Sequence, residues 1–334
     1  MSLEARPQAL HLIAGFMITQ AMGFVARLGI ADLVAEQPRS IEQLAEETGL
    51  DVDGLARVVR ALASVGVFAT DDGLVRTTEV GELLRSDVPG SIRSIAMAFA
   101  NEHYAAWGEA SESFETGEPA FPRVFGSAYF DWLGSHPPEA AVFNRAMGSG
   151  AAAKQVVLVA RDWADVETVV DVGGGTGSVL CAILSADPRL RGVVVDLAHA
   201  RDGAEATIAA AGLEDRCTFV EGSFFERVPD GADVYILSQI LHDWSDEQAT
   251  AILRVCRAAV RQDSTLLLVD AVLRPGDEPD WAKVMDLHML VMFGGRERSE
   301  EGWRSLLAAG GFRLERIVPA GPGTVVEATP DGFP

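Results

Sequence analysis

Cysteine and basic residues are both scarce in this chain. Its 334 residues include only three cysteines, which are too few and too widely spaced for a disulfide framework or a zinc site, and we expect no metal. Lys and Arg number 27 against 49 Asp and Glu, which gives a net charge of −22 at pH 7. Because an acidic surface repels nucleic acid and anionic membranes, we expect neither as a partner.

Long apolar stretches are missing as well. No run approaches 18 residues, and no charged segment followed by a short apolar one opens the chain. We therefore expect no membrane span and no secretory signal, and place the protein in the cytoplasm. The apolar share of 48% still allows a sizeable core, and the length is typical of two domains.

The pattern of residues 8 to about 100 predicts helices. The stretch ALHLIAGFMITQAMGFVARLGIADLVAE is apolar on most faces, so it must be buried, and a partner subunit is one place to bury it. Ser40 is the expected N-cap of a later helix, a turn in TGLDVDG leads to a second helix, and GVFATDDGLVRTT predicts a hairpin. Helix, turn, helix and hairpin together suggest a winged helix.

Winged helices often bind DNA, but the charge of this one argues against it. From Ile41 to Arg85 there are nine acidic residues and four arginines, a net charge of −5. The helix that would enter a groove of DNA lacks a basic face. A structural or dimerisation role is therefore the better expectation, and a winged-helix regulator with a sensing domain is the alternative from another class of protein.

From about residue 166 strands and helices alternate. The near-continuous apolar strands, such as ETVVDVGG, RGVVVDL and ADVYILS, predict a mostly parallel sheet covered on both faces, and the tail GFRLERIVPAGPGTVVEATP predicts two more strands at one edge. We thus expect an α/β, doubly wound fold after a helical part. The predicted division is a helical, winged-helix domain over 1–100, a helical connector over 101–160, and a ligand-binding domain over 161–334.

The segment VVDVGGGTGS, residues 169–178, ends the first strand and opens a helix. Its glycines allow a ligand to approach the backbone. The dinucleotide pattern G-x-G-x-x-G/A fits poorly, because its last position is Ser178. A second acid, Asp196, ends the next strand, where a carboxylate can bind a ribose diol. This spacing serves both NAD and S-adenosylmethionine, and a glycine-rich turn without a ligand is the plain structural alternative.

Four segments in order carry a resemblance to a known family. VVDVGGGTGS, VVVDLAHA, GSFFERVPDGADVYILSQILHDWSDEQ and MDLHMLVMFGGRERSEEGW resemble the S-adenosylmethionine-dependent O-methyltransferases that methylate small phenols. The family includes plant caffeate-type enzymes and bacterial enzymes of antibiotic pathways. The resemblance implies a Rossmann-like, class I methyltransferase fold, an interlocked homodimer through the N-terminal domain, an aromatic acceptor, and S-adenosylhomocysteine as the product left by the cofactor.

The resemblance also assigns a cofactor site. The glycine loop would pass beside the methionyl group, Asp196 would bind the ribose hydroxyls, and Phe224 would flank the adenine. Many relatives have Asp where this chain has Ser223, and some have Lys where it has Ser238, so the adenine side lacks a charged partner here. The full predicted set is Asp171, Gly173, Gly174, Gly175, Asp196, Leu197, Ser223, Phe224 and Ser238.

His242 lies just before a helix whose start is marked by a capping box of Ser245 and Gln248. It therefore falls on a loop at the carboxyl end of a strand, where ligands bind in a doubly wound sheet. A His with an ordinary pKa near 6.5 can take the proton of a phenol as general base. By family position Asp270 and Glu297 would hold its second nitrogen. A core or capping His is the plain alternative.

The acceptor pocket is expected from the segment WAKVMDLHMLVMFGG, whose methionines recur on one helix face. Such a stripe is either ordinary core or the wall for a flat aromatic ring, because Met makes good contacts with aromatic groups. By family position Phe143 and Met147 also lie on the acceptor side. The predicted acceptor set is Phe143, Met147, Asp243, Met285, Met289 and Met292.

The sequence thus predicts methyl transfer from S-adenosylmethionine to a hydroxyl of an aromatic metabolite, in a bacterial biosynthetic pathway. A relative that keeps the cofactor but catalyses decarboxylation or hydroxylation is the first alternative. Retention of His242 together with two acids argues against it.

Overall fold

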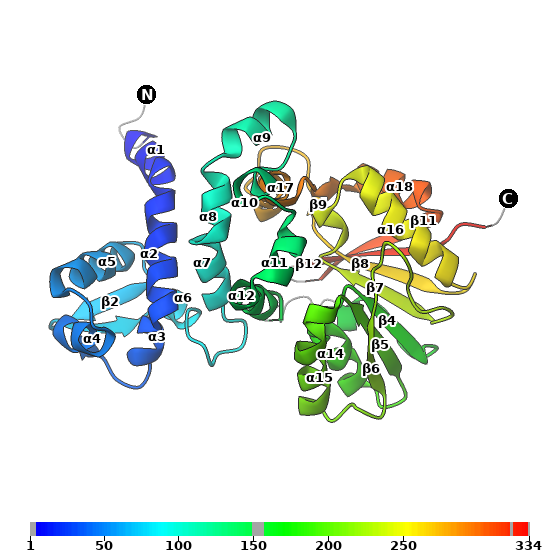
Figure 1. Cartoon of the computed structure of the whole chain (residues 1–334), viewed down its shortest axis with the longest axis horizontal. Helices are drawn as coiled ribbons and strands as arrows, with labels where there is room; N and C mark the ends of the chain where they lie inside the picture. Colours follow the sequence, from blue (N-terminus) through cyan, green and yellow to red (C-terminus); the bar gives the residue numbers. More distant parts are fainter. Residues whose placement is uncertain (1–4, 149–156, 321–322, 333–334) are drawn as a thin grey trace. The chain divides into compact units, whose positions relative to one another are not determined.

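The computed structural model describes residues 5–148, 157–320 and 323–332, which belong to two compact units. The first unit comprises Met1–Gly108 and Pro137–Ser149, and the second comprises Glu109–His136 and Gly150–Pro334. Residues 101–160, which the sequence groups as one connector, are divided between the two units. Figure 1 shows the helices and strands of both.

The first unit is mostly helical and contains one small sheet. Strands β2 and β3 form a hairpin whose two-residue turn has positive φ at Asp72 and Gly73, as a tight hairpin requires. Strand β1 adds to β3 in antiparallel fashion. The elements are α1 (Ala5–Ile13), α2 (Gly15–Leu28), α3 (Ile30–Leu33), β1 (Arg39–Ser40), α4 (Ile41–Thr48), α5 (Val52–Ser64), β2 (Phe68–Asp71), β3 (Leu74–Thr77), α6 (Glu79–Glu82), α7 (Arg93–Phe99), α8 (Glu102–Trp107) and α12 (Pro137–Gly148).

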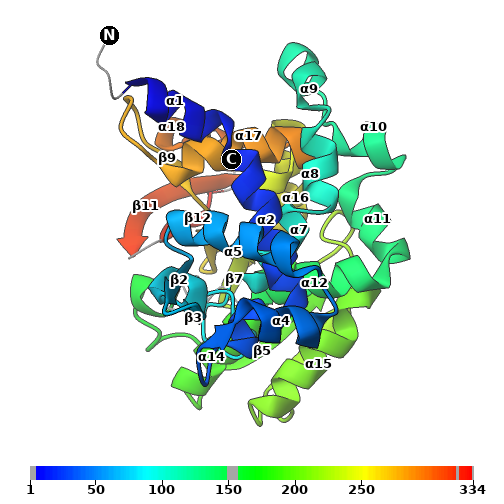
Figure 2. The ribbon, with the colours of Figure 1, turned by 90° about the vertical axis from the view of Figure 1, so that its left-hand side faces the viewer.

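The helix, turn, helix and hairpin lie where the sequence predicts them. Ser40 caps α4 by accepting a hydrogen bond from the backbone N–H of Gln43, whose side chain accepts from the Ser40 backbone in return. This confirms the predicted N-cap. Helix α5 packs against α2, α4 and β2, and its Leu55, Val59 and Leu62 are buried in the core of this unit (Figure 2).

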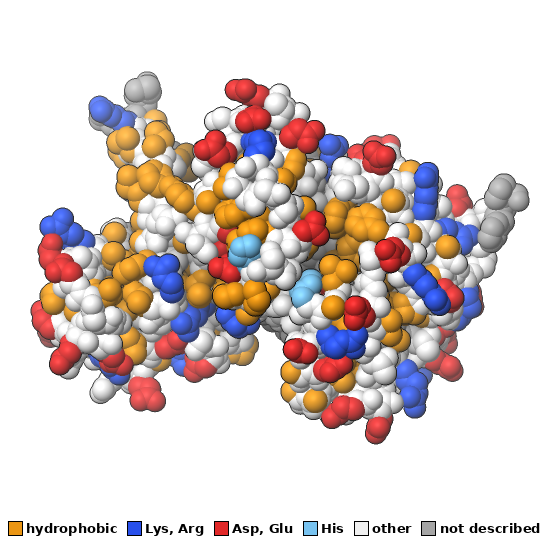
Figure 3. Space-filling model, in the orientation of Figure 1, with side chains coloured by type: hydrophobic (Ala, Val, Ile, Leu, Met, Phe, Trp, Pro, Cys, Tyr) orange, Lys and Arg blue, Asp and Glu red, His pale blue; other side chains and the backbone are white. Residues whose placement is uncertain are grey.

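The N-terminal helices are only partly buried. Helix α1 has no buried residue, and the apolar side chains along α1 and the start of α2 are 47–78% exposed. They form the apolar strip at the upper left of Figure 3 and comprise Leu10, Leu12, Ile13, Phe16 and Met17. Among the described residues no single helix is long and apolar enough to cross a membrane; only α1 and α2 taken together, bent by 47°, meet that length and composition.

The second unit begins with three short helices and continues as alternating strands and helices. Its elements are α9 (Ala110–Thr116), α10 (Phe121–Phe125), α11 (Tyr129–Ser135), β4 (Thr168–Val172), α14 (Ser178–Ala186), β5 (Arg191–Asp196), η1 (Ala198–Ala200), α15 (Arg201–Ala210), β6 (Cys217–Glu221), β7 (Val234–Ser238), η2 (Leu241–Asp243), α16 (Asp246–Ala259), β8 (Thr265–Val269), β9 (Val272–Leu273), α17 (Trp281–Phe293), β10 (Arg298–Ser299), α18 (Glu300–Ala309), β11 (Phe312–Ala320) and β12 (Gly323–Pro330).

A seven-stranded sheet organises this unit, in the order β11-β12-β8-β7-β4-β5-β6. The strands from β8 to β6 are parallel, and β12 pairs with both β8 and β11 in antiparallel fashion. Apolar residues of α14 and α15 pack on one face, and those of α16 and α18 on the other (Figure 1). The predicted doubly wound sheet and its two edge strands are confirmed. Five parallel strands therefore end at one edge, at Val172, Asp196, Glu221, Ser238 and Val269.

Candidate active site

The glycine loop leaves β4 and is fastened to the end of the neighbouring strand. The backbone N–H of Gly173 donates to the carbonyl of Val195 at 2.8 Å, and that of Gly175 donates to the Asp196 carboxylate at 2.7 Å. The other oxygen of Asp196 accepts from the Leu197 N–H at 2.6 Å. Both loop glycines have positive φ, 68° and 55°, which a side chain would strain. Asp196 thus holds the glycine loop in place through a hydrogen bond. Its binding of ribose hydroxyls stays a prediction.

Asp171 lies beneath this loop. The residue is 1% exposed, and a Cβ added at Gly174 would lie 2.6 Å from the Asp171 carboxyl carbon. Neither carboxyl oxygen makes a hydrogen bond of normal geometry. Burial first, and then the Asp196 carboxylate, raise the Asp171 pKa to about 7, against a small opposing effect of the Leu180 N–H. A buried acid without a partner is a group that a ligand donor or cation would satisfy.

The adenine-side residues of the prediction also reach this edge. Ser223 and Phe224 follow β6, and Ser238 is the last residue of β7. A Cβ at Gly173 would lie 3.2 Å from the ring of Phe224 and 2.6 Å from Ile240, so both side chains border the glycine loop. Sequence reasoning missed Ile240, because an apolar residue after a strand carries no signal of its own.

His242 is buried among three carboxylates in the turn η2, after β7. Its Nδ1 lies 2.9 Å from Glu297 Oε1, in a hydrogen bond, and 3.7 Å from Asp270 Oδ1. Its Nε2 lies 3.5 Å from Asp243 Oδ1. His242 is 8% exposed, and Asp270 and Glu297 are each 5% exposed. The structure therefore brings together the three predicted catalytic side chains, with both acids on the Nδ1 side.

Burial and charge oppose each other at His242. Burial alone would lower its pKa, but Asp243, Asp270 and Glu297 together raise it to about 10. The pKa of His242 in this pocket therefore differs from the ordinary value near 6.5 that the sequence suggested. Burial also raises the pKa values of Asp243 and Asp270 to about 7, although His242 opposes both rises. The group titrates as a coupled set, and at neutral pH it holds protons that isolated side chains would release.

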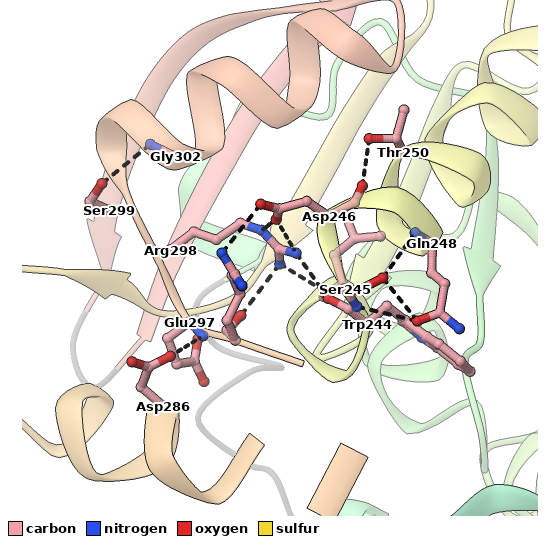
Figure 4. A network of polar contacts seen from close by, with 12 residues as sticks. Trp244, Ser245, Asp246, Gln248, Thr250, Asp286, Glu297, Arg298, Ser299 and Gly302 are labelled. Carbon is pink, nitrogen blue, oxygen red and sulfur yellow. Dashed lines mark hydrogen bonds and ion pairs between the residues drawn. The ribbon is translucent and has the colours of Figure 1, made fainter. Parts of the chain in front are cut away.

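Glu297 is fixed by a contact that the sequence did not indicate. Its backbone N–H donates to Asp286 Oδ1 at 2.9 Å, which ties the segment after α17 back to that helix (Figure 4). The predicted capping box at the start of α16 is present, with Ser245 accepting from the Gln248 N–H. It fixes the chain on the other side of His242. Among the described residues no group of three or more His, Cys, Asp and Glu is arranged to hold a metal ion.

The methionines of α17 differ in exposure. Met292 is 0% and Met289 3% exposed, as in an ordinary core stripe, whereas Met285 is only partly buried. His288 on the same helix is buried, and burial, followed by the charge of His242, lowers its pKa to about 4. Sequence reasoning missed it among the methionines. The predicted acceptor residues Phe143 and Met147 lie on α12, in the first unit, and their assignment stays a prediction.

Aromatic rings from three distant segments lie close to the His242 turn. Phe130 of α11 stacks on Phe293 at the end of α17, with centroids 5.6 Å apart, and on Trp244 at 6.0 Å. Phe225 meets Trp244 edge-on at 4.7 Å. Because Trp244 follows the turn directly, these flat apolar surfaces lie next to the turn that carries His242. This part of the second unit has the chemistry of a site for an aromatic ring.

An open glycine loop beside a buried base is what an enzyme needs to bind a nucleoside-type cofactor and remove a proton from a second substrate. The fold is that of the class I methyltransferases. The chain matches the family models of the O-methyltransferase domain over residues 107–313 and of the O-methyltransferase dimerisation domain over residues 10–87. It therefore belongs to the O-methyltransferase family.

Individual relatives support the same family over nearly the whole chain. A phenazine O-methyltransferase of Lysobacter antibioticus is 44% identical, over 96% of this chain and 95% of the relative. The crystal structure of LaPhzM has a TM-score of 0.93 at 43% identity and covers 99% of this chain and 100% of its own. NcsB1, solved with S-adenosylmethionine and 2-hydroxy-5-methyl naphthoic acid, has a TM-score of 0.81 at 35% identity, over 93% and 95%.

Asp171→Asn should make the ligand-free protein more stable than the wild type, and the gain in the free energy of unfolding should grow as pH rises. The raised pKa means that folding favours the protonated acid, so the wild-type protein loses stability between about pH 4 and pH 7, where the unfolded chain ionises freely. Asn never ionises. Urea unfolding should show a gain of about 1–2 kcal/mol at pH 5 and on the order of 3–4 kcal/mol at pH 8. As a control, Asp187→Asn should change stability in the opposite direction, because the partly buried Asp187 carboxylate pairs with Arg189, which lowers its pKa. An equal effect of Asp171→Asn at both pH values would contradict the assignment.

Proposed function

We propose that this enzyme transfers a methyl group from S-adenosylmethionine to a hydroxyl of an aromatic metabolite, with His242 as the general base. The observation that carries the proposal is the buried imidazole, whose Nδ1 is held by Glu297 and whose Nε2 is left on the other side of the ring. Relatives include a phenazine O-methyltransferase and an O-demethylpuromycin-O-methyltransferase, which favours a bacterial secondary metabolite as the acceptor.

The residues present fit the cofactor. The unpartnered acid beneath the glycine loop and the open space above Gly175, where an added Cβ would meet nothing within 4 Å, leave room for a ligand at the loop. Asp196 would bind the ribose hydroxyls through the lone pairs that its two backbone bonds leave free. Phe224 would flank the adenine, and Ser223 would accept from it without a charge. When bound, S-adenosylmethionine supplies a methyl group already activated by a positively charged sulfur.

The chain's own contribution to the chemistry is alignment and removal of one proton. A phenol with a pKa near 10 is mostly protonated at neutral pH, so its oxygen attacks poorly unless a base takes the proton. His242 would accept this proton at Nε2, which would let the phenol oxygen take the methyl group as its bond to sulfur breaks and S-adenosylhomocysteine leaves. Asp270 and Glu297 then stabilise the imidazolium and fix the ring orientation. Because the cluster titrates as a set, the resting proton on His242 is passed to a neighbouring carboxyl before the base can act.

The acceptor ring would lie against the aromatic side chains around Trp244. Met285 of α17, which is partly accessible, would extend its wall, and Asp243 would meet a polar group of the acceptor. The match to a dimerisation domain over residues 10–87 supports a homodimer, and the exposed apolar strip of α1 and α2 gives that domain an uncovered surface.

His242→Ala should lower kcat by about 10²–10⁴ while the affinity for S-adenosylmethionine barely changes, because the side chain acts on the acceptor proton only. The loss should shrink as pH approaches the pKa of the phenol, since solvent then supplies phenolate. Steady-state kinetics from pH 6.5 to 9.5 with an unactivated and an acidified phenol measure both effects. Nearly full activity at neutral pH on the unactivated phenol would show that His242 is structural.

Asp196→Ala should weaken cofactor binding by roughly 10- to 100-fold, because it removes charged hydrogen-bond acceptors and leaves the Gly175 and Leu197 N–H groups unpaired. Calorimetry with S-adenosylhomocysteine measures the change. The exposed Asp202→Ala is the control and should bind like the wild type. Unchanged affinity of the Asp196 variant would remove the ribose assignment.

The double substitution Leu12→Glu and Ile13→Glu should convert the dimer into monomers. Both side chains are exposed in the single chain, and a carboxylate buried against a partner without a counter-charge costs several kcal/mol. Light scattering coupled to gel filtration reports the mass. Val159→Glu, at an equally exposed apolar position in the second unit, is the control. A variant that remains a tight dimer would place the interface elsewhere.

A further inference from the structure

The turn that carries His242 is held by its backbone carbonyls. The segment after α17 supplies the donors: Arg298 Nη1 donates to Leu241 O at 2.8 Å, the Arg296 backbone N–H donates to His242 O at 2.8 Å, and Arg298 Nη2 donates to Trp244 O at 3.0 Å. Three of the four carbonyls from Leu241 to Trp244 therefore accept from residues 296–298. We call these three hydrogen bonds the carbonyl clamp. They are independent of the acids that contact the imidazole.

The segment after α17 approaches the His242 turn so closely that position 295 requires a glycine. A Cβ at Gly295 would lie 2.1 Å from His242 O and 2.8 Å from Asp243 O, closer than any side chain allows. The two segments thus meet backbone to backbone, and Arg298 spans what remains of the gap. Figure 4 shows its guanidinium between Trp244 and Asp246.

Every N–H of the Arg298 guanidinium has an acceptor. Besides the two carbonyls, Nη1 reaches Arg296 O at 3.4 Å, and Nε and Nη2 donate to Asp246 Oδ1 at 3.0 and 2.9 Å. Arg298 is 3% exposed, and its guanidinium lies 5.4 Å from the ring centroid of Trp303. A planar fork with five donors can satisfy this set, and the single ammonium group of Lys cannot.

Arg298 also lies where the two acids of the cluster are joined. It pairs with Val272 in the parallel β9–β10 ladder, so Glu297, one residue before it, and Asp270, two residues before Val272, come from adjacent segments. The ring of Trp303 adds to this junction, because its Nε1 donates to Ala271 O at 3.0 Å. The side chain of Arg298 holds the turn and its backbone pairs with β9, so both sets of contacts meet at one residue.

We infer that Arg298 is a positioning residue for methyl transfer: its guanidinium fixes the His242 turn relative to Asp270 and Glu297. The inference rests on the proposed function for its kinetic consequence. The hydrogen bonds from Arg298 to the turn carbonyls account for this positioning. The ion pair with Asp246 contributes little, because the Asp246 side chain is 59% exposed. Without Arg298 two turn carbonyls lose charged donors, and the base moves relative to its acceptor.

Two variants of Arg298 separate its geometry from its charge. Arg298→Lys keeps the cation and loses the fork, so kcat should fall by about 10-fold or more with the pH profile in place. Arg298→Met loses both. Because the Arg298 charge lowers the pKa of Asp270, its removal favours protonated groups in the cluster, and the acidic limb of kcat should also move to higher pH. The Kd for S-adenosylhomocysteine should stay within about twofold in both, as the glycine loop is untouched.

Two neighbouring variants serve as matched controls. Arg296→Met removes a cation that pairs with the same Asp246, at 3.4 Å, but keeps the backbone N–H to His242 O. Asp246→Asn removes the acid itself. Both should keep kcat within about twofold. If either loses as much as Arg298→Lys, or if Arg298→Lys keeps wild-type kcat, the carbonyl clamp is overturned.

Amide hydrogen exchange tests the clamp without any assay of activity. The Asp243 and Trp244 N–H groups are bonded within the turn, to Ile240 O and Leu241 O. Their exchange should quicken in Arg298→Lys and not in Arg296→Met, and unchanged exchange would overturn the inference. His242→Ala, measured in the same kinetic series, tests the proposed function separately. If this variant keeps its activity, His242 is not the general base, and the hydrogen-exchange result for Arg298 still stands. If Arg298→Met does not fold, the Lys variant decides.

Discussion

The burial of one imidazole among three carboxylates is the constraint on which this site depends. A charge taken out of water must be paired and hydrogen-bonded, and unequal numbers of opposite charges leave protons on groups that would otherwise be ionised. His242 with Asp243, Asp270 and Glu297 is such a set, which explains why its pKa rises while those of two acids rise as well. The cluster is stable only while the turn and the two acid-bearing segments keep their distances.

Much of this arrangement could be predicted from the sequence because it follows from strand ends. Parallel strands end at one edge, so Asp196 at the end of one apolar strand and His242 after another were expected at the same edge of the sheet. Asp270 was placed by family position. Glu297 follows a helix rather than a buried strand, and only the family motif indicated its place. The N-cap at Ser40 and the capping box of Ser245 and Gln248 were equally readable, since they depend on residues close in sequence.

What the sequence did not show depends on contacts across long separations. The raised pKa of His242 is set by side chains up to 55 residues away, and the clamp by Arg298 joins segments 54–57 residues apart. Periodicity also failed to distinguish core from pocket on α17. Met289 and Met292 share a face with Met285, but packing buries the first two almost completely and leaves Met285 partly accessible. A stripe pattern carries no information on which neighbour covers it.

In the N-terminal helices, too, hydropathy does not indicate which neighbour covers an apolar surface. Their sequence is apolar nearly all round, and this predicted burial, yet α1 has no buried residue within the single chain. In a chain of net charge −22, a contiguous apolar strip stands out against an acidic surface, and such strips mark interaction sites. The chain's acidic surface repels a second copy at long range, whereas apolar contact at this strip would favour association at close range. Burial of α1 is therefore not met within the single chain, and its burial against a second copy stays a prediction.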